Sequence, residues 1–474
     1  MGPRRRSCPQ GSLVVSGDEA QQGAQRRGKP ASARTPIEDK PGLDARRTAA
    51  RLLAAVIDTR TPLDALTDNE HGHPQYLALE QRDRALVRAI LISSLRHRCT
   101  IEKLIGRRLD RPLPPNAHLL SHILHVGAAQ ILFLDVPDSA AVDLAVAQAK
   151  ADPRAARFSG LVNAVLRNIA RRKHELPKAL ENTRDAPAWF AERLEAIYGR
   201  DGADAILKAH RLEAPIDFTV KSDPALWAER LGGRVLPNGS VRLDRLPGPV
   251  PELPGFSEGA WWVQDAAASL PARLLGDVEG LFVADLCAAP GGKTAELALE
   301  GARVTAVDLS DNRLKRLKAN LDRLGLAVEI VRADVLSWEP NRKFDAVLLD
   351  APCSSTGTVR RHPDVPWTKT PEDIAKLADL QGRLLERALT FVHPSGMVVF
   401  SNCSLDPSEG EELVRNLLAT RDDVAVDPIL PEELPGAEHF VTAEGFLRTT
   451  PAITSAEGQL DNIDGFFAAR LRLR

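Results

Sequence analysis

Asp285-Leu-Cys-Ala-Ala-Pro-Gly-Gly-Lys-Thr294 is the stretch that decides the fold of this 474-residue chain. It follows an apolar run at 281–284 and precedes good helix-forming sequence at 294–298, so the local order is strand, glycine-rich turn, helix. Such a turn leaves backbone N–H groups at a helix N-terminus, where they can hold part of a cofactor. The stretch therefore predicts a Rossmann-like α/β domain with a cofactor loop at 287–293.

Two other kinds of nucleotide loop fit this stretch less well. Gly292-Lys-Thr294 resembles the end of a phosphate-binding P-loop, but that motif needs a glycine at position 287, where the chain has Cys287. The G-x-G-x-x-G spacing of a dinucleotide-binding loop is also absent. A purely structural turn remains as the third alternative.

Aspartates follow the strands expected in this domain. The run at 303–307 ends at Asp308, about twenty residues past the loop, where a carboxylate can hold both ribose hydroxyls. Asp334, after the run at 328–331, is expected to reach an adenine amino group, and Asp350 ends the run at 344–349. Any one of them could instead cap a helix. Four such residues, with Asp285, favour a cofactor that carries adenosine, because unpaired carboxylates are costly in a sheet core.

Two of the five cysteines are placed for chemistry. The chain has no C-x-x-C pair and no His/Cys cluster, so no metal site and no disulfide framework is predicted, and the usage fits a reducing cytoplasm. We expect Cys8 and Cys99 to be incidental or to serve packing. Cys353 and Cys403 each follow an apolar strand, at the sheet edge where an open α/β fold holds its ligands. A single cysteine there is usually a small buried apolar residue. Two thiols beside an adenosine cofactor suit methylation of carbon 5 of a pyrimidine.

The loop and the two cysteine segments resemble motifs of a known family. Residues 287–293 (CAAPGGK), Asp350-Ala-Pro-Cys353 and Ser401-Asn-Cys-Ser404 are similar to motifs I, IV and VI of the Nop/Sun RNA 5-methylcytosine methyltransferases. The family's common form of the last motif is Thr-Cys-Ser, so Asn402 is a departure that leaves the cysteine in register. The resemblance covers at least residues 185–474.

This resemblance implies S-adenosylmethionine as the cofactor and a cytosine in RNA as the target. It implies Cys403 as the nucleophile, Cys353 as the thiol that assists release, and Asp350 as the residue that binds the base. From the residues alone the two thiol roles could be exchanged, because DNA 5-methylcytosine enzymes use the Pro-Cys thiol as nucleophile. The residues expected at the cofactor are Cys287, Ala288, Ala289, Pro290, Gly291, Gly292, Lys293, Asp308, Asp334 and Asp350.

The first half of the chain is predicted to be all-helical. Between 43 and 173 the apolar residues recur on single helix faces, namely Leu86, Val87, Ile90, Leu91 and Leu95, then Leu119, Leu120, Ile123, Leu124 and Ile131. Residues 158–168 are similar to the last helix of NusB-like RNA-binding domains, next to a basic edge that includes Arg167 and Arg171. Such an edge is more often only a solvated helix face. Together with the methyltransferase motifs, it implies small-subunit (16S) ribosomal RNA as the partner.

Four segments are therefore expected: a disordered tail at 1–40, a NusB-like helical RNA-binding domain at 41–175, a small linking or RNA-recognition subdomain at 185–258, and the Rossmann-like methyltransferase domain at 259–474. The net charge of −2 excludes a uniformly basic surface, so basic residues should gather locally, as in Arg360-Arg-His362. No signal peptide and no apolar run of membrane-spanning length is present. A cytoplasmic monomer is expected.

Two other functions remain open at this stage. One is an RNA-binding adaptor whose methyltransferase-like half is non-catalytic, although both cysteines and all four aspartates are present. The other is a nucleotide-dependent enzyme that uses Lys293 on a phosphate, which a comparison of S-adenosylmethionine with ATP binding would separate.

Overall fold

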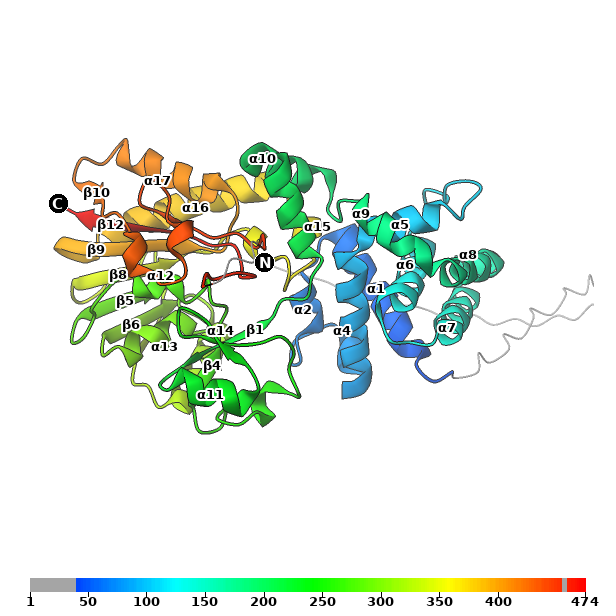
Figure 1. The fold of residues 1–474 in the computed structure, drawn as a ribbon, viewed down its shortest axis with the longest axis horizontal. Coiled ribbons are helices and arrows are strands. Elements are labelled where there is room, and N and C mark those ends of the chain that lie inside the picture. The colour runs from blue at the N-terminus through cyan, green and yellow to red at the C-terminus, as the bar shows by residue number, and fades with distance from the viewer. Residues whose placement is uncertain (1–39, 454–457) are drawn as a thin grey trace, which may run out of the picture. The chain divides into compact units, whose positions relative to one another are not determined.

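The computed structural model describes residues 40–453 and 458–474, so Cys8 and the expected tail lie outside the described residues. The first part of the described chain is helical, as expected (Figure 1). None of the described helices is long and apolar enough to cross a membrane. The helices of this part are α1 (Leu43–Thr59), α2 (Leu63–Thr67), α3 (Pro74–Leu77), α4 (Gln81–Arg96), α5 (Arg98–Gly106), α6 (His118–Phe133), α7 (Asp138–Ala151), α8 (Ser159–Arg171) and α9 (Leu176–Glu181).

Helix α6 lies at the centre of the helical domain. It is buried along most of its length, and α1, α7 and α8 contribute to the same apolar core. Gly127 lets α8 approach closely, because a Cβ atom at this position would lie 2.6 Å from Leu166 Cδ1. The residues expected on the apolar face of α4, from Val87 to Leu95, are buried in this core, and so are Leu120, Ile123, Leu124 and Ile131 of α6.

A long helix and a small antiparallel sheet follow. Helix α10 (Ala188–His210) changes direction at Gly199. The sheet has the order β2-β3-β1-β4, with β1 (Ile216–Val220), β2 (Arg234–Val235), β3 (Val241–Leu243) and β4 (Trp261–Val263), and α11 (Pro224–Leu231) packs beside it. Strand β4 pairs with β1, so the small sheet extends past residue 258, where the subdomain was expected to end.

The large sheet of the described chain has eight strands in the order β10-β12-β9-β8-β5-β6-β7, with β11 beside β12. The five from β5 to β9 are parallel, and the last three in sequence join antiparallel. Their bounds are β5 (Phe282–Leu286), β6 (Arg303–Asp308), β7 (Glu329–Arg332), β8 (Phe344–Asp350), β9 (Val392–Asn402), β10 (Val424–Val426), β11 (Leu447–Arg448) and β12 (Phe467–Leu473). The strand order reverses between β5 and β8, which is where such a sheet binds its ligands.

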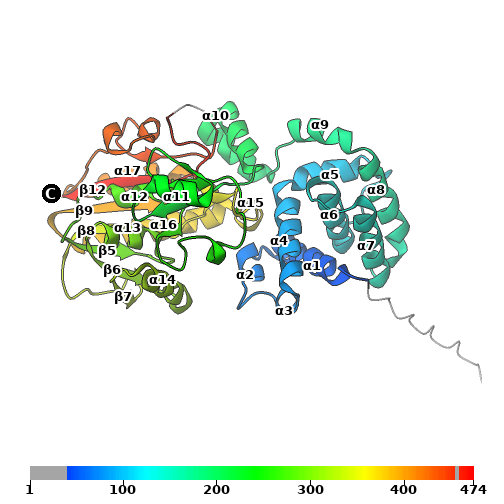
Figure 2. The same ribbon diagram turned by 60° about the horizontal axis from the view of Figure 1, so that its bottom comes forward.

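Helices cover both faces of the large sheet (Figures 1 and 2). Helices α16 (Pro371–Leu389) and α17 (Glu411–Leu418) pack on one face, and α12 (Leu270–Arg273), α13 (Gly292–Leu299) and α14 (Asp311–Leu324) pack on the other. Because both faces are buried, the central strands are apolar runs without alternation. This arrangement confirms the expected fold class, an all-α N-terminal domain followed by an α/β domain.

The helical domain and the α/β domain are in contact through both apolar and polar side chains. Trp367, in the short helix α15 (Val365–Thr368), packs against the core of the helical domain. The Asp364 carboxylate accepts a 2.9 Å hydrogen bond from the backbone N–H of Leu63, at the first residue of α2. Asp64 forms a 3.1 Å ion pair with His362. The segment that follows Cys353 therefore rests on the helical domain.

Two buried histidines make the folded state sensitive to acid. Burial, together with the smaller effect of the charges of Arg98 and Arg360, respectively, lowers the pKa of His125 and of His210 to about 3. The ring of His210 lies nearly parallel to that of Phe190, and neither of its nitrogens has a hydrogen-bond partner among the described residues. An unfolded histidine has a pKa near 6.5, so between these values the unfolded chain binds more protons than the folded one.

We therefore expect stability to be lost as the pH falls from about 6.5 toward 3. The substitution His210→Phe removes one titrating group and keeps an aromatic ring against Phe190. It should reduce the loss of unfolding free energy between pH 6.5 and pH 5 by about 2 kcal/mol. Chemical denaturation of both proteins at the two pH values measures this difference. An equal pH dependence in the variant and the wild type would show that His210 is not a neutral buried group.

Candidate active site

Cys353 and Cys403 lie side by side beyond the carboxyl ends of two neighbouring parallel strands. Asp350, the last residue of β8, pairs in register with Ser401 of β9, and the segments that follow the two strands then leave the sheet. The two sulfur atoms are 3.4 Å apart, and both thiols are partly exposed. The structure thus brings together the two thiols that the sequence singled out.

The two thiols differ in acidity. The hydrogen bond between the sulfurs lowers the pKa of Cys403 below its ordinary value, and this effect outweighs the opposing effect of burial. The same hydrogen bond, together with burial, raises the pKa of Cys353 well above its ordinary value. The pair therefore ionises at Cys403 first, with the Cys353 S–H donating to the resulting thiolate.

Asp350 is held between a lysine and a serine. Lys293 Nζ donates a 2.8 Å hydrogen bond to Asp350 Oδ2, and Ser401 Oγ donates a 3.0 Å bond to Oδ1. Burial lowers the pKa of Lys293, but the neighbouring carboxylate more than offsets this and the net shift is upward. Lys293 is therefore a buried ammonium group whose position is set by Asp350.

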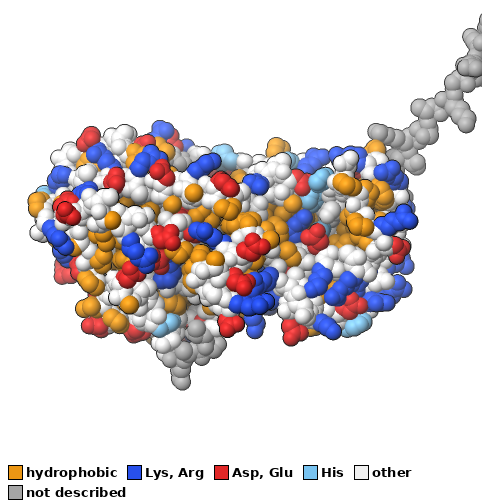
Figure 3. Space-filling model, turned by 90° about the horizontal axis from the view of Figure 1, so that it is seen from above, with side chains coloured by type: hydrophobic (Ala, Val, Ile, Leu, Met, Phe, Trp, Pro, Cys, Tyr) orange, Lys and Arg blue, Asp and Glu red, His pale blue; other side chains and the backbone are white. Residues whose placement is uncertain are grey.

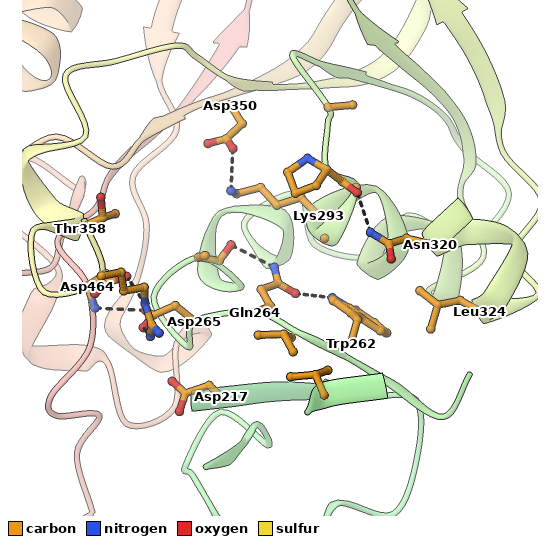
Figure 4. Close-up of a pocket in the computed structure, with 18 of the residues that line it drawn as sticks. Asp217, Trp262, Gln264, Asp265, Lys293, Asn320, Leu324, Asp350, Thr358 and Asp464 are labelled. Atoms are coloured by element: carbon orange, nitrogen blue, oxygen red, sulfur yellow. Dashed lines mark hydrogen bonds and ion pairs between the residues drawn. The ribbon is translucent and has the colours of Figure 1, made fainter. Parts of the chain in front are cut away.

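Lys293 and Asp350 form part of the wall of a cavity of about 670 Å³ (Figure 4). Lys293 points across this cavity toward Asp350, while Asp265 and Asp464 lie to one side of it. Trp262 and Leu324 lie on the opposite side. Other residues of its wall are Asp217, Gln264, Asp285, Ala288, Pro290, Gly291, Gly292, Asn320, Thr358, Arg361, His362 and Phe466.

The basic residues expected beside the site are paired internally. Arg360 is fully buried, and its Nη2 donates a 2.8 Å hydrogen bond to Asp464. Arg361 lines the cavity but bridges Asp464 at 2.8 Å and Asp265 at 2.5 Å. Arg361 and His362 thus lie beside the site, as expected, but two carboxylates distant in sequence neutralise both guanidinium groups.

The glycine-rich loop has the backbone that its sequence predicts. Cys287 and Gly291 adopt left-handed conformations, with φ of 62° and 101°, and α13 begins at Gly292. The first N–H groups of a helix have no partner within it, and Gly292 and Lys293, the first residues of α13, line the cavity. Cys287 and Ala289 belong to the same loop but do not line the cavity.

Asp308 and Asp334 also follow the strands as expected, but neither lines the cavity. Asp308 ends β6 and is 3% exposed. Its carboxylate accepts a hydrogen bond from the Ala289 N–H and forms an ion pair with Arg313 at 3.3 Å. Asp334 is exposed and lies two residues beyond β7. The backbone hydrogen bond from Ala333 N–H to Asp308 O, 3.2 Å long, joins the two strand ends.

Asp285 was not expected among the cofactor residues, but it lines the cavity. It is fully buried in β5, and Thr294 Oγ1 donates a 2.5 Å hydrogen bond to its Oδ2. Its Oδ1 has no hydrogen-bond partner among the described residues. Burial, with a smaller contribution from the charge of Asp350, raises the pKa of Asp285 to about 7. A cationic ligand group would satisfy this carboxylate.

Several other wall residues were missed because their strands carry no sequence signal for the site. Gln264 and Asp265 follow β4 of the small sheet, and Asp464 and Phe466 precede the last strand of the large sheet. Of these residues, Asp464 and Phe466 belong to the segment Asp464-Gly-Phe-Phe-Ala468, which also resembles the Nop/Sun family in sequence but carried no assignment to the site. No group of His, Cys, Asp and Glu side chains in the described segments is arranged to hold a metal ion.

Two protein families match the chain. The family described as 16S rRNA methyltransferase RsmB/F matches residues 272–472, and the NusB family matches residues 43–171. The ribosomal RNA small subunit methyltransferase B of Cronobacter sakazakii is 32% identical over 451 residues, which cover 91% of this chain and 99% of that protein. The protein of the same name from Vibrio vulnificus is 33% identical over 398 residues, covering 80% and 91%.

Solved structures share the fold. The crystal structure of PH0851 matches with a TM-score of 0.67 at 23% identity and covers 91% of this chain and 99% of that one. A methyltransferase homologue from Pyrococcus horikoshii matches with a TM-score of 0.51 at 30% identity, covering 60% and 94%.

The acidity difference between the thiols predicts their order of alkylation. Iodoacetamide reacts with the thiolate, so at neutral pH Cys403 should be labelled before Cys353. Burial raises the pKa of Cys99 to about 11 and that of Cys287 to about 12, so both should react slowly. In the variant Cys353→Ala the hydrogen-bond donor is lost, and Cys403 should require a higher pH. Peptide mass spectrometry of timed samples gives each rate, and faster labelling of Cys353 would contradict the assignment.

Proposed function

The chain belongs to the 16S rRNA methyltransferase RsmB/F family, and on that premise we propose that it methylates carbon 5 of a cytosine through a covalent bond to Cys403. It is an S-adenosylmethionine-dependent methyltransferase of ribosomal RNA. One observation carries the proposal for carbon 5. Two thiols of unequal acidity lie 3.4 Å apart at the strand ends, beside Asp350 and its partner Lys293.

The first step is addition of the Cys403 thiolate to carbon 6 of the base. Carbon 5 of cytosine is a poor nucleophile, but formation of the S–C6 bond saturates carbon 6 and moves the double bond to C4=C5, giving an enamine whose carbon 5 can attack a methyl group. The lowered pKa of Cys403, due first to its hydrogen bond with Cys353, supplies the thiolate near neutral pH. S-adenosylmethionine supplies the electrophilic methyl group.

Asp350 and Lys293 are placed to hold the base during this step. The Asp350 carboxylate can accept a hydrogen bond from the exocyclic amine of cytosine, and it fixes Lys293 Nζ at 2.8 Å. Addition at carbon 6 pushes negative charge toward N3 and O2 of the ring. A buried ammonium group beside the ring stabilises this charge more than water would.

Cys353 is placed to complete the reaction. In the resting site its pKa is raised first by the hydrogen bond to Cys403. Once the Cys403 sulfur is bonded to carbon 6, it no longer carries the negative charge that disfavours ionisation of Cys353. Cys353 can then lose its own proton to water, and the resulting thiolate takes the proton from carbon 5, so that the C5=C6 double bond forms again and the Cys403 thiolate leaves.

The cofactor residues proposed are those of the loop 287–293 with Asp308, Asp334 and Asp350. The methionine part of S-adenosylmethionine carries an ammonium group and a carboxylate. The unpartnered Oδ1 of Asp285 fits the ammonium group, and the N–H groups at the start of α13 fit the carboxylate. Asp308 would hold the ribose hydroxyls in place of Arg313, whose side chain is half-exposed and therefore held only weakly. Asp334 would reach the adenine.

The two other functions considered from the sequence fit less well. A phosphate-binding lysine should be free to reach its ligand, whereas Lys293 is paired with Asp350. A non-catalytic adaptor has no use for two thiols in hydrogen-bond contact. We propose that the helical domain contributes RNA binding, and that the target base is unstacked to reach the two thiols.

The first prediction concerns the ribose. The variant Asp308→Ala should weaken S-adenosylmethionine binding by about 1.5 to 3 kcal/mol, because hydrogen bonds to a charged group are lost. Asp311→Ala is the matched control, since Asp311 is an exposed carboxylate three residues further along that pairs with Arg332. Titration calorimetry measures both. Unchanged affinity in Asp308→Ala would remove Asp308 from the cofactor site.

The second prediction separates the two thiols. Cys403→Ala should form neither methylated RNA nor a covalent complex, because the attacking sulfur is gone. Cys353→Ala should still attack and transfer the methyl group but should release slowly, so a denaturant-resistant RNA adduct should accumulate. A denaturing gel with labelled ribosomal RNA distinguishes the two outcomes.

The control for this experiment is Cys99→Ala, because Cys99 is distant in sequence from both strand ends and its thiol contacts the Ala186 carbonyl. It should behave as the wild type does. A trapped complex from Cys403→Ala and none from Cys353→Ala would reverse the two roles.

A further inference from the structure

Glu409 is a buried carboxylate that the proposed chemistry leaves without a role. It is 0% exposed and lies in the short 3-10 turn η5 (Pro407–Glu409), six residues after Cys403. No Lys or Arg forms an ion pair with it among the described side chains. A buried carboxylate without a cation has to be stabilised by hydrogen bonds, and Glu409 accepts four of them from side chains and backbone.

One carboxylate oxygen of Glu409 holds the two cysteine loops together. Its Oε2 accepts 2.5 Å hydrogen bonds from Ser354 Oγ and from Ser404 Oγ. Ser354 directly follows Cys353, and Ser404 directly follows Cys403. The two hydroxyl oxygens are themselves 3.1 Å apart. A single oxygen atom therefore fixes the spacing between the residues next to the two thiols.

The other carboxylate oxygen and the backbone carbonyl of Glu409 connect to the residues that precede the two cysteines. Glu409 Oε1 accepts from the Ser354 backbone N–H at 2.9 Å and from Gln381 Nε2 at 2.8 Å. Gln381 Nε2 also donates to the carbonyl of Pro352, the residue before Cys353. Asn402, the residue before Cys403, donates from its Nδ2 to the Glu409 carbonyl at 2.6 Å.

These hydrogen bonds hold the residues directly before and after each cysteine, and none of them involves a sulfur atom. All five members of the network are buried, at 1% exposure or less, namely Ser354, Gln381, Asn402, Ser404 and Glu409. The negative charge of Glu409 also lies near Cys353, where it adds to the hydrogen bond from Cys403 and to burial in raising the pKa of that thiol. The departure at Asn402 from the usual threonine is thus part of the same network.

We propose that Glu409 is a positioning residue that sets the contact between the Cys353 thiol and the Cys403 sulfur, and so makes Cys403 the nucleophile. This inference rests on the proposed function for the roles of the two thiols, but the thiol contact itself can be measured without RNA. Glu409 would act through Ser354 and Ser404 and would not touch the base or the cofactor.

The test uses the full-length variant Glu409→Gln, which has nearly the same shape but lacks the charge and one acceptor. The control is Glu433→Gln, a partly buried carboxylate that pairs with Arg470 away from the cysteine loops. For each protein we would measure the pH midpoint of iodoacetamide labelling at Cys403, single-turnover methylation, S-adenosylmethionine affinity and thermal stability.

In Glu409→Gln the Cys403 labelling midpoint should rise by about one pH unit, because the donor thiol is no longer held in place. Single-turnover methylation should fall about 100-fold, the size expected when reacting groups are displaced by about 1 Å. The cofactor affinity should stay at the wild-type value, and Glu433→Gln should match the wild type in the labelling midpoint, in methylation and in cofactor affinity.

A second variant protects the test against misfolding. Ser354→Ala/Ser404→Ala removes the two hydroxyls that Glu409 Oε2 holds and should reproduce the shift in the labelling midpoint. Adding Glu409→Gln to this pair should cause little further shift, because both changes break the same contact.

The possible outcomes are distinct. A lower melting temperature with an unchanged Cys403 midpoint would mean that Glu409 only stabilises the fold, and would overturn the proposal. A wild-type enzyme that does not methylate carbon 5, with a midpoint that still shifts in Glu409→Gln, would overturn the proposed function and leave the positioning role standing.

Discussion

The parallel pairing of β8 with β9 is the constraint on which the rest of the site depends. This pairing places Asp350 opposite Ser401. The segments that follow β8 and β9 therefore leave the sheet at the same edge, and they bring Cys353 and Cys403 into contact. A slip of one residue would turn Asp350 to the other face of the sheet. Because both faces of these strands are packed under helices, such a slip would also move core side chains such as Leu349 and Phe400 onto the opposite face and disrupt their packing. The apolar core thereby determines the geometry of the polar site.

Buried charges fix the shape of the cavity. Arg242 pairs with Asp217 at 2.6 Å, and the two neighbouring arginines at 360 and 361 share Asp464. Buried pairs like these add little net stability, because desolvation offsets the attraction, but breaking one leaves an uncompensated charge. They therefore hold wall segments that come from distant parts of the chain. On the face seen in Figure 3, Lys and Arg side chains are interspersed with Asp and Glu side chains, in keeping with the net charge of −2.

The sequence predicts the parts of this site that depend on local order, and it misses the parts that depend on long-range pairing. The loop before α13 and the strand-end position of Cys353 and Cys403 follow from apolar runs and from the glycines. The pairing of β12 with β9 brings Asp464 to the cavity from more than a hundred residues away from Arg360, and no periodicity records it. The position of Asp308 at the end of its strand was expected from the sequence, but its partner Arg313 lies on the following helix and could not be assigned without coordinates.

The segment after Cys353 joins the two halves of the described chain physically. It contributes Thr358 and His362 to the cavity wall and then packs Trp367 against the core of the helical domain. The bond from Leu63 to Asp364 crosses between the domains, with the carboxylate buried, so loss of the helical domain would leave that carboxylate without this partner. The helical domain is therefore more than an attached binding module, because it also supports one wall of the cavity. An RNA that binds both domains would contact a surface whose two sides are already held together by this segment.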